Sequence, residues 1–308
     1  MKFSMHPERW DEVIAELDEA GHTYVSDIAG ADFLIFNGGT RDFPDPLPEN
    51  IGFVQWPFAG VDHLIARGVM TPSVRWANAG GVYAKPVAEV ALGLIIAQFH
   101  QFKTATLAGS FAPKQEIEAT QQWLFHDKTV ALIGAGGIGG ELIEMLRPFG
   151  VRTIAVNRSG RSVEGADETH ALGALDDAGD VWERADIVVL SAPLTEQTRG
   201  LLNAEKLRRM KNTALVVNVG RGALVNTDDL VEALIDGQIA GAAMDVTDPE
   251  PLPEDHPLWG MDNVLITPHI AAPAEVARLL IGAQIVENAA AFERGETMPT
   301  EVDVEAGY

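Results

Sequence analysis

The sequence contains no cysteine. Without a thiol the protein can form no disulfide, use no thiolate nucleophile and bind no metal through sulfur. No pair of histidines follows the H-E-x-x-H spacing of a metal-binding helix, so we expect no metal site. This expectation covers His6, His22, His63, His100, His126, His170 and His256, and His63, in VDHL, is interpreted as structural.

Basic residues are scarce. The chain has 22 Lys and Arg against 45 Asp and Glu, which gives a formal net charge of −23 at pH 7. This negative charge disfavours sequence-independent binding to nucleic acid and binding to an anionic membrane, so we expect neither as a partner. The acidic excess is interpreted as a well-solvated surface. Adaptation to high salt is the alternative, and composition does not separate the two.

Long apolar runs are also missing. The longest, Val87 to Ala97, is interrupted by Glu89 and is shorter than the roughly 20 residues of a membrane span. The N-terminus, MKFSMHPERWDEVI, has no apolar signal core. We therefore expect a cytoplasmic protein. With 308 residues, 46% of them hydrophobic, the chain is long enough for two globular domains.

The most informative stretch runs from Val130 to Asn157. An apolar run there is followed by Gly134, Gly136 and Gly139 in G-x-G-x-x-G spacing, then by a helical apolar pattern and a second β-branched run. The glycines allow a tight turn, a close approach of a pyrophosphate and packing of helix on strand. The helix N-terminus offers unpaired N–H groups to the phosphates. This context favours a dinucleotide site over a purely structural turn.

Strands and helices alternate along the rest of the chain. Before the glycine turn we expect strands at 33–36, 52–56 and 74–77, helices at 7–20 and 61–67, and a long helix from Pro86 that bridges two domains. Residues 104–128 are expected to form a short helix and an irregular connection. After the turn we expect strands at 187–190, 214–219, 241–246 and 264–267, and helices at 175–184, 204–210, 227–235 and 274–292. This alternation predicts an α/β fold of two doubly wound parallel sheets.

Three polar residues follow predicted strands of the second half. Arg221 comes after VVNV, Glu250 after MDV and His269 after VLIT. Ligands of an open α/β sheet lie beyond the carboxyl ends of its strands, so these side chains should converge beside the dinucleotide. Reduction of a 2-oxo acid needs a cation for the substrate oxygens, a proton donor and a group that favours the charged donor. Arg221, His269 and Glu250 fit these tasks in that order.

Each of the three residues has a structural alternative when taken alone. Arg221 could be an exposed loop arginine, Glu250 one surface acid among many, and His269 a strand-end histidine satisfied by the backbone. Their joint occurrence downstream of a dinucleotide turn favours catalysis.

Seven motifs extend over most of the chain: FAGVDHL at 58–64, AEVALGLIIA at 88–97, ALIGAGGIG at 131–139, PLTEQTRGLLNAEKLRRMK at 193–211, VNVGRGALVNTDDL at 217–230, AAMDVTDPEPLPEDHPLW at 242–259 and ITPHIAA at 266–272. In these motifs the sequence resembles the D-isomer-specific 2-hydroxyacid dehydrogenases. The resemblance implies a Rossmann dinucleotide-binding domain, at 99–272, inserted into a flavodoxin-like substrate domain, at 1–98 and 273–308. It also implies an active site in the cleft between the domains and a homodimer formed through the nucleotide domain.

The resemblance further implies the role of individual residues. Arg221 binds substrate, Glu250 partners the histidine, and His269 is the acid/base. The backbone of Ala59 and Gly60 holds the substrate carboxylate, and Asp245 contacts the nicotinamide carboxamide. The implied cofactor contacts are Gly134, Gly136, Gly137, Ile138, Gly139, Asn157, Arg158, Ser159, Arg161, Pro193, Thr195, Val219, Gly220 and Asp245.

Two departures from the family pattern concern the cofactor. The family often has arginine where this chain has Gly137, so one phosphate contact is lost or moved. At the end of the second strand, an NAD enzyme would carry a carboxylate for the ribose hydroxyls. Here Asn157 is followed by Arg158, Ser159 and Arg161, which suit a 2′-phosphate, and we expect NADP to be preferred over NAD. The alternative is that both arginines point to solvent and either cofactor serves.

The expected activity is reduction of a small 2-oxo acid, with glyoxylate and hydroxypyruvate the leading substrates. Relatives that oxidise phosphite or formate share the scaffold, but a phosphite enzyme would be expected to resemble the family with lysine in place of Ala59. The alternative from another class is a dinucleotide-sensing binding protein, because the family also resembles transcriptional corepressors with a similar Arg, Glu and His set. The absence of a regulatory extension favours the enzyme.

Overall fold

The chain folds into two compact units, and each is described by itself. In the computed structural model the first unit comprises residues 1–83 and 272–308, and the second comprises residues 84–271. The second unit is therefore an insertion into the first. The structure describes all residues except 126 and 176–179. His126 and part of the helix predicted at 175–184 lie outside the described residues.

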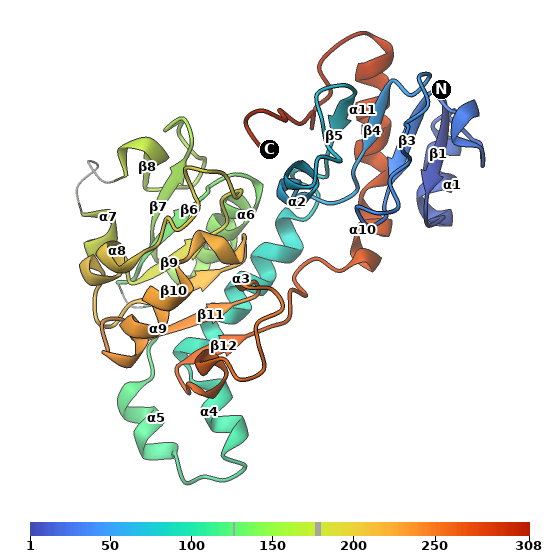
Figure 1. The fold of residues 1–308 in the computed structure, drawn as a ribbon. Coiled ribbons are helices and arrows are strands. Elements are labelled where there is room, and N and C mark those ends of the chain that lie inside the picture. Colours follow the sequence, from blue (N-terminus) through green and yellow to red (C-terminus); the bar gives the residue numbers. More distant parts are fainter. Residues whose placement is uncertain (126, 176–179) are drawn as a thin grey trace. The chain divides into compact units, whose positions relative to one another are not determined.

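The first unit is a five-stranded parallel sheet in the order β2-β1-β3-β4-β5 (Figure 1). Its strands are β1 (Lys2–His6), β2 (Thr23–Tyr24), β3 (Phe33–Phe36), β4 (Phe53–Gln55) and β5 (Arg75–Ala77), and its helices are α1 (Asp11–Glu19), α2 (Asp62–Ala66), α10 (Ala274–Leu280) and α11 (Gly282–Glu293). The register aligns Phe3, Phe33 and Phe53 on adjacent strands. Their rings stack with centroids 5.6 and 4.6 Å apart. This strand order is that of flavodoxin-like sheets.

The second unit is a seven-stranded parallel sheet in the order β12-β11-β10-β9-β6-β7-β8. Its strands are β6 (Thr129–Ile133), β7 (Arg152–Asn157), β8 (Glu168–Ala171), β9 (Ile187–Leu190), β10 (Leu215–Asn218), β11 (Gly241–Met244) and β12 (Val264–Ile266). Its helices are α3 (Ala84–Phe99), α4 (Phe102–Leu107), α5 (Lys114–Thr120), α6 (Gly137–Leu146), α7 (Val181–Arg184), α8 (Ala204–Arg209) and α9 (Thr227–Ile235). The strand order reverses between β6 and β9, which is the switch point of a Rossmann sheet.

The central strands of the second sheet are buried on both faces. All residues of β9, IVVL, and of β10, LVVN, are buried, as continuous apolar runs in parallel sheets require. Helices α3 and α6 pack against each other, and α4 and α5 project from this unit (Figure 1). The two sheets confirm the predicted fold class.

Several local elements differ from the sequence expectations. The closing helix predicted at 274–292 is two helices, α10 and α11, with a bend at Ile281 between them. A Cβ at the next residue, Gly282, would overlap the Glu16 side chain. Residues 104–128 contain the end of α4 and all of α5, rather than one short helix. The helix predicted from Pro7 begins at Asp11, and the strands β2 and β8 were not predicted. The long helix α3, assigned from sequence to the substrate domain, groups with the second unit, where it packs on α6.

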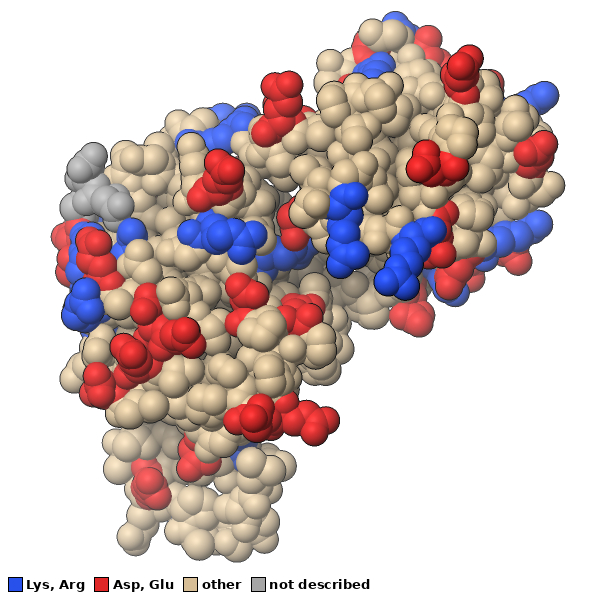
Figure 2. Space-filling view, in the orientation of Figure 1, with Lys and Arg blue, Asp and Glu red and all other residues tan. Residues whose placement is uncertain are grey.

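Acidic side chains are spread over the face of both units that Figure 2 shows, with smaller groups of basic side chains among them. Over residues 1–125, 127–175 and 180–308, no helix is long and apolar enough to cross a membrane. The same residues contain no group of three His, Asp or Glu side chains that could hold a metal ion.

Candidate active site

The glycine turn lies between β6 and α6. Gly134 has a φ of +99°, and a Cβ at this position would clash with the Ala192 backbone that follows β9. Only glycine fits such a close approach of two chain segments. Gly136 faces open space, because a Cβ there would meet nothing nearer than the Gly134 carbonyl oxygen at 4.0 Å.

Helix α6 begins at Gly137 without a side-chain cap. This helix start lies at the switch point of the sheet, next to the open space at Gly136. Uncapped N–H groups and the helix dipole attract phosphate. The turn thus has the room and the donors for the pyrophosphate of a dinucleotide.

The loop after β7 is closed by the side chain of Asn157. Its Oδ1 accepts from the Ser159 N–H at 3.1 Å and the Gly160 N–H at 2.7 Å, and its Nδ2 donates to the Arg161 carbonyl oxygen at 2.6 Å. Arg158, Ser159 and Arg161 are exposed on this loop. The amide of Asn157 thus shapes the loop. The Ser159 hydroxyl also bonds within it, accepting from the Arg161 N–H at 3.3 Å, and the side chains of Arg158 and Arg161 are exposed.

His269 and Glu250 meet at the carboxyl edge of the second sheet. His269 Nδ1 lies 2.6 Å from Glu250 Oε1, and Glu250 Oε2 accepts from the Thr247 N–H at 3.3 Å. Both side chains are about half exposed, at 48% and 43%. His269 has a left-handed φ of +53°, and its N–H donates to the Asp245 carbonyl oxygen at 2.8 Å. A strained non-glycine backbone at a strand end is typical of a functional position.

Asp245 ties the histidine loop to β11. Its Oδ1 accepts from Thr267 Oγ1 at 2.6 Å and the Ile270 N–H at 3.0 Å, and its Oδ2 accepts from the Ala271 N–H at 3.0 Å. Asp245 is 2% exposed. A carboxylate has about four acceptor positions, so about one is left for another donor.

Arg221 follows β10, in a loop that packs against the loop carrying Glu250. Its Nη1 donates to the Gly220 carbonyl oxygen at 2.8 Å, and its own carbonyl oxygen accepts from Asn218 Nδ2 at 2.9 Å. The next residue, Gly222, lies directly against the Thr247 carbonyl group. A side chain at Gly222 would force the two loops apart, and nothing in the sequence pattern singled out this residue or Thr247.

The remaining expected cofactor residues lie in the loops after β9 and β10. The loop of Pro193 and Thr195 is closed by Thr198, whose Oγ1 donates to the Pro193 carbonyl oxygen at 2.7 Å and accepts from the Thr195 N–H at 2.8 Å. Val219 and Gly220 are buried after β10. These loops leave the same carboxyl edge as the glycine turn.

Ala59 and Gly60 lie in the first unit, in the loop between β4 and α2. Ala59 is exposed and Gly60 half-buried. Across the described part of the chain, neither N–H donates to an acceptor in the protein. The Ala59 carbonyl oxygen, in contrast, accepts from Asn78 Nδ2 at 2.8 Å, a contact that the motifs did not indicate.

A Rossmann sheet with an uncapped, glycine-rich helix start, and with a histidine in contact with a glutamate at its carboxyl edge, has the groups that dinucleotide binding and proton transfer require. The family model described as D-isomer specific 2-hydroxyacid dehydrogenase, NAD binding domain, matches residues 91–271. The chain belongs to this family of oxidoreductases, which confirms the resemblance found in the motifs.

Relatives and solved structures agree with this assignment. An uncharacterized protein in the proB 3′ region of Corynebacterium melassecola is 56% identical over 308 residues, covering all of both chains. The mouse glyoxylate reductase/hydroxypyruvate reductase is 32% identical over 262 residues, covering 84% of this chain and 79% of the mouse protein. A D-isomer specific 2-hydroxyacid dehydrogenase from Xanthobacter autotrophicus Py2, solved with NADPH and MES, is 28% identical with a TM-score of 0.83, covering 100% and 99% of the two chains.

Proposed function

We propose that the protein reduces a small 2-oxo acid, such as glyoxylate or hydroxypyruvate, to the D-2-hydroxy acid and prefers NADPH to NADH. The observation that carries this proposal is the 2.6 Å contact between His269 Nδ1 and Glu250 Oε1 at the carboxyl edge of the Rossmann sheet. The named activity of the mouse relative and the NADPH in the Xanthobacter structure support the same chemistry.

His269 is the proton donor in this proposal. Its Nδ1 is engaged by the Glu250 carboxylate, which leaves Nε2 for the substrate oxygen. When bound, NADPH supplies the hydride that adds to C2 of the oxo acid. The carbonyl electron pair moves to the oxygen, and His269 Nε2–H protonates that oxygen. Glu250 stabilises the charged imidazolium before transfer and holds the ring in one orientation throughout.

The substrate oxygens are assigned to cationic and backbone donors. Arg221 presents a planar guanidinium that suits a carboxylate and an adjacent carbonyl oxygen. We assign the carboxylate also to the N–H groups of Ala59 and Gly60, because both lack an acceptor among the residues that the structure describes.

The cofactor is assigned to the loops at the carboxyl edge of the second sheet. The uncapped start of α6, at Gly137, suits the pyrophosphate. The exposed Arg158, Ser159 and Arg161 suit a 2′-phosphate, and residues 157–161 include no carboxylate that would repel it. The full set assigned to the cofactor is Gly134, Gly136, Gly137, Ile138, Gly139, Asn157, Arg158, Ser159, Arg161, Pro193, Thr195, Val219, Gly220 and Asp245.

The decisive experiment follows the loss of nicotinamide absorbance with glyoxylate, hydroxypyruvate, pyruvate and a bulkier 2-oxo acid, each with NADPH and NADH. We expect turnover with the small oxo acids, and a fall in kcat of about 10²- to 10⁴-fold for His269→Ala. His256→Ala, which changes another histidine of the same unit, is the matched control and should keep kcat. Tight dinucleotide binding without turnover on any oxo acid would instead indicate a sensor.

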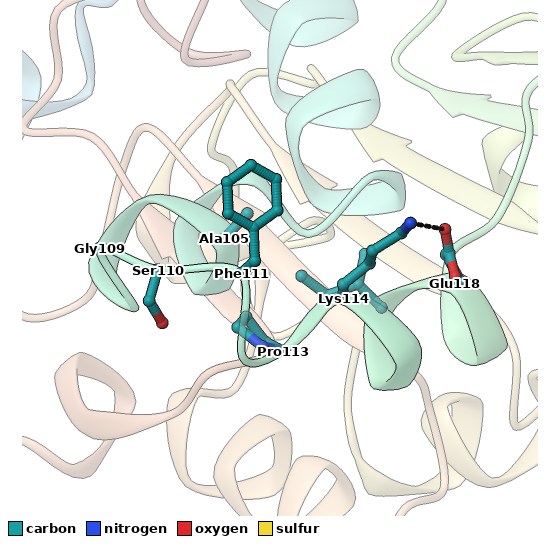
Figure 3. A pocket seen from close by; sticks show the side chains of 8 residues that line it. Ala105, Gly109, Ser110, Phe111, Pro113, Lys114 and Glu118 are labelled. Atoms are coloured by element: carbon teal, nitrogen blue, oxygen red, sulfur yellow. Dashed lines mark ion pairs between the residues drawn. The ribbon is translucent and has the colours of Figure 1, made fainter.

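We also infer that the protein forms a homodimer through its second unit. Large apolar side chains are exposed on and beside α4 and α5: Phe102, Leu107, Phe111, Trp123, Phe125 and Trp259. Phe111, 92% exposed, stands at the turn between these helices, beside a hollow lined by Ala105, Ile117 and the Lys114–Glu118 ion pair (Figure 3). Most of the surface of α4 and α5 in Figure 2 is uncharged. Exposed apolar groups gathered in this way mark association surfaces.

The mass in solution tests the dimer. We expect Phe111→Ser combined with Leu107→Ser to shift the protein towards the monomer in analytical ultracentrifugation. Ile235→Ser, which changes a 69% exposed residue on α9, is the matched control and should leave the mass unchanged. If the wild-type protein had the mass of a monomer, the proposed dimer would be refuted, and the proposed activity would be unaffected.

A further inference from the structure

Every carbonyl group of the loop Pro57–Gly60 accepts a hydrogen bond. Four consecutive carbonyl groups are thereby fixed, although the loop belongs to no helix or strand. Two of the donors, a main-chain N–H and a side-chain amide, follow β5. The other two are the indole N–H of a tryptophan and the hydroxyl of a tyrosine. The pairs are Pro57 O with the Tyr83 hydroxyl, Phe58 O with the Ala79 N–H at 3.1 Å, Ala59 O with Asn78 Nδ2 at 2.8 Å, and Gly60 O with Trp56 Nε1 at 3.0 Å.

Fixing these carbonyls also fixes the N–H groups proposed to bind substrate. In a trans peptide the N–H points opposite to the C=O of the same unit. The Ala59 N–H shares its peptide with the Phe58 carbonyl, and the Gly60 N–H shares its peptide with the Ala59 carbonyl. Both N–H groups are therefore turned away from the donors, Ala79 and Asn78. Successive backbone N–H groups that no protein acceptor engages are donors available to an anion.

Asn78 is held in a single orientation by its own contacts. Its Oδ1 accepts from the Gly80 N–H at 2.9 Å, which leaves Nδ2 for Ala59. Its main-chain N–H donates to the Thr300 carbonyl oxygen at 3.0 Å. Its main-chain carbonyl oxygen accepts from Gln55 Nε2 at 3.0 Å and from Thr300 Oγ1 at 2.7 Å. Both the amide and the backbone of Asn78 are therefore fixed.

The support behind Asn78 is a buried polar network. Gln55 and Asn288 are 0% exposed, and Asn288 Nδ2 donates to Gln55 Oε1 and to Thr300 Oγ1, each at 2.9 Å. Satisfied polar groups in the interior are rigid, because any rotation would leave one of them unpaired and without water. The network joins α11 and the C-terminal segment to the loop after β5, all within the first unit.

We propose that Asn78 is a positioning residue for the substrate carboxylate: its amide fixes the Ala59 carbonyl group and so aims the Gly60 N–H at the carboxylate. The inference rests on the proposed function, because it takes the substrate to be a 2-oxo acid bound by Ala59 and Gly60. It predicts that Asn78 governs substrate affinity without touching substrate or cofactor.

The test compares Asn78→Asp and Asn78→Ala with Asn50→Asp. Asn50 also donates from Nδ2 to a backbone carbonyl of the first unit, that of Ala31, so it is a matched control away from the loop. We expect both Asn78 variants to raise KM for the oxo acid about tenfold to a hundredfold, with kcat within about threefold. This is the effect of weakening the hydrogen bond from the Gly60 N–H to the substrate carboxylate. The Kd for oxamate, an unreactive carboxylate analogue, should rise by the same factor, and the Kd for NADPH should not change.

Three results decide the matter. If the Asn78 variants lower Tm but keep KM and the oxamate Kd of Asn50→Asp, the role is structural only and the inference is overturned. If KM rises in Asn78→Asp but not in Asn78→Ala, the new charge is responsible and the inference is also overturned. If the wild type turns over no oxo acid, the proposed function itself fails, which is a different outcome from either.

Discussion

Gly222 lies so close to Thr247 that a Cβ on the glycine would overlap the Thr247 carbonyl group and stand 2.5 Å from the Asp248 nitrogen. The loop of Arg221 and the loop of Glu250 can therefore pack together only while residue 222 has no side chain. This contact explains how two loops that follow different strands keep a fixed spacing.

We expect Gly222→Ala to lower kcat/KM by about a hundredfold or more, because one of the two loops must move and misplace Arg221 or Glu250. Steady-state kinetics and Tm measure the effect. Gly93→Ala, on α3, is the control: a Cβ there meets nothing within 4 Å, and alanine favours a helix by up to about 1 kcal/mol over glycine. Equal kinetics for the two variants would contradict the role assigned to Gly222.

Asp245 is expected to control the position of His269. Asp245→Asn keeps one acceptor oxygen but turns an NH₂ group towards donors, so the bonds from Thr267, Ile270 and Ala271 cannot all persist. We expect kcat to fall about tenfold to a hundredfold. Thr267→Val removes one of these bonds and should give a smaller fall. Thr106→Val, on α4, is the control, and a loss of kcat in this variant as large as in Thr267→Val would contradict the argument.

The sequence predicted the parts of this protein whose signal is local. The apolar runs of β9 and β10 and the glycine turn after β6 each specify their own structure, so the Rossmann unit and the strand-end residues Arg221, Glu250 and His269 followed from spacing. The polar strand β8, ETHA, carries no such run and was missed. Strand β8 is stabilised by its parallel pairing with β7 and by side-chain bonds such as those between Glu168 and Arg184. Neither kind of contact produces an alternating hydrophobic pattern in the sequence.

The contacts that position the residues of the proposed site could not be predicted either, because they join residues that are distant in the sequence. Asn78 and Ala59 are separated by 19 residues, and their contact depends on how β4 and β5 pair. Asn157 was placed correctly at the end of a strand, but its amide forms hydrogen bonds within the loop that follows. A residue type and its position indicate what chemistry is available, whereas the partners depend on the folded chain.

The loop after β7 gives a prediction about the cofactor. Asn157→Asp keeps the acceptor for Ser159 and Gly160 but loses the donor to Arg161 and adds a negative charge beside the 2′-position. We expect the ratio of kcat/KM for NADPH over NADH to fall about tenfold to a hundredfold, because a carboxylate repels phosphate and binds ribose hydroxyls. Asn203→Asp, at the N-cap of α8, adds the same charge elsewhere and should leave the ratio unchanged. An unchanged ratio in both variants would mean that the loop does not select the cofactor.

Glu168 on β8 gives a prediction about acid stability. Arg184 donates from Nη1 and Nη2 to the two carboxylate oxygens at 2.9 and 2.8 Å, and these bonds lower the pKa of Glu168 to about 2. Because the folded pKa is lower than the unfolded pKa, the stabilisation is complete above about pH 4.5 and is lost as the pH falls towards 2. The side chains of Glu168 and Arg184 are 27% and 32% exposed, so solvent screening reduces the effect.

We therefore expect Glu168→Gln to lower the free energy of unfolding at pH 7 by on the order of 2 kcal/mol. The difference from wild type should shrink as the pH falls from 4.5 to 2, where wild-type Glu168 also becomes neutral. Urea unfolding at a series of pH values measures both quantities. Glu254→Gln, in an exposed loop, is the control and should differ little from wild type at any pH. A pH-independent difference for Glu168→Gln would mean that the carboxylate stabilises the fold by packing rather than through its charge.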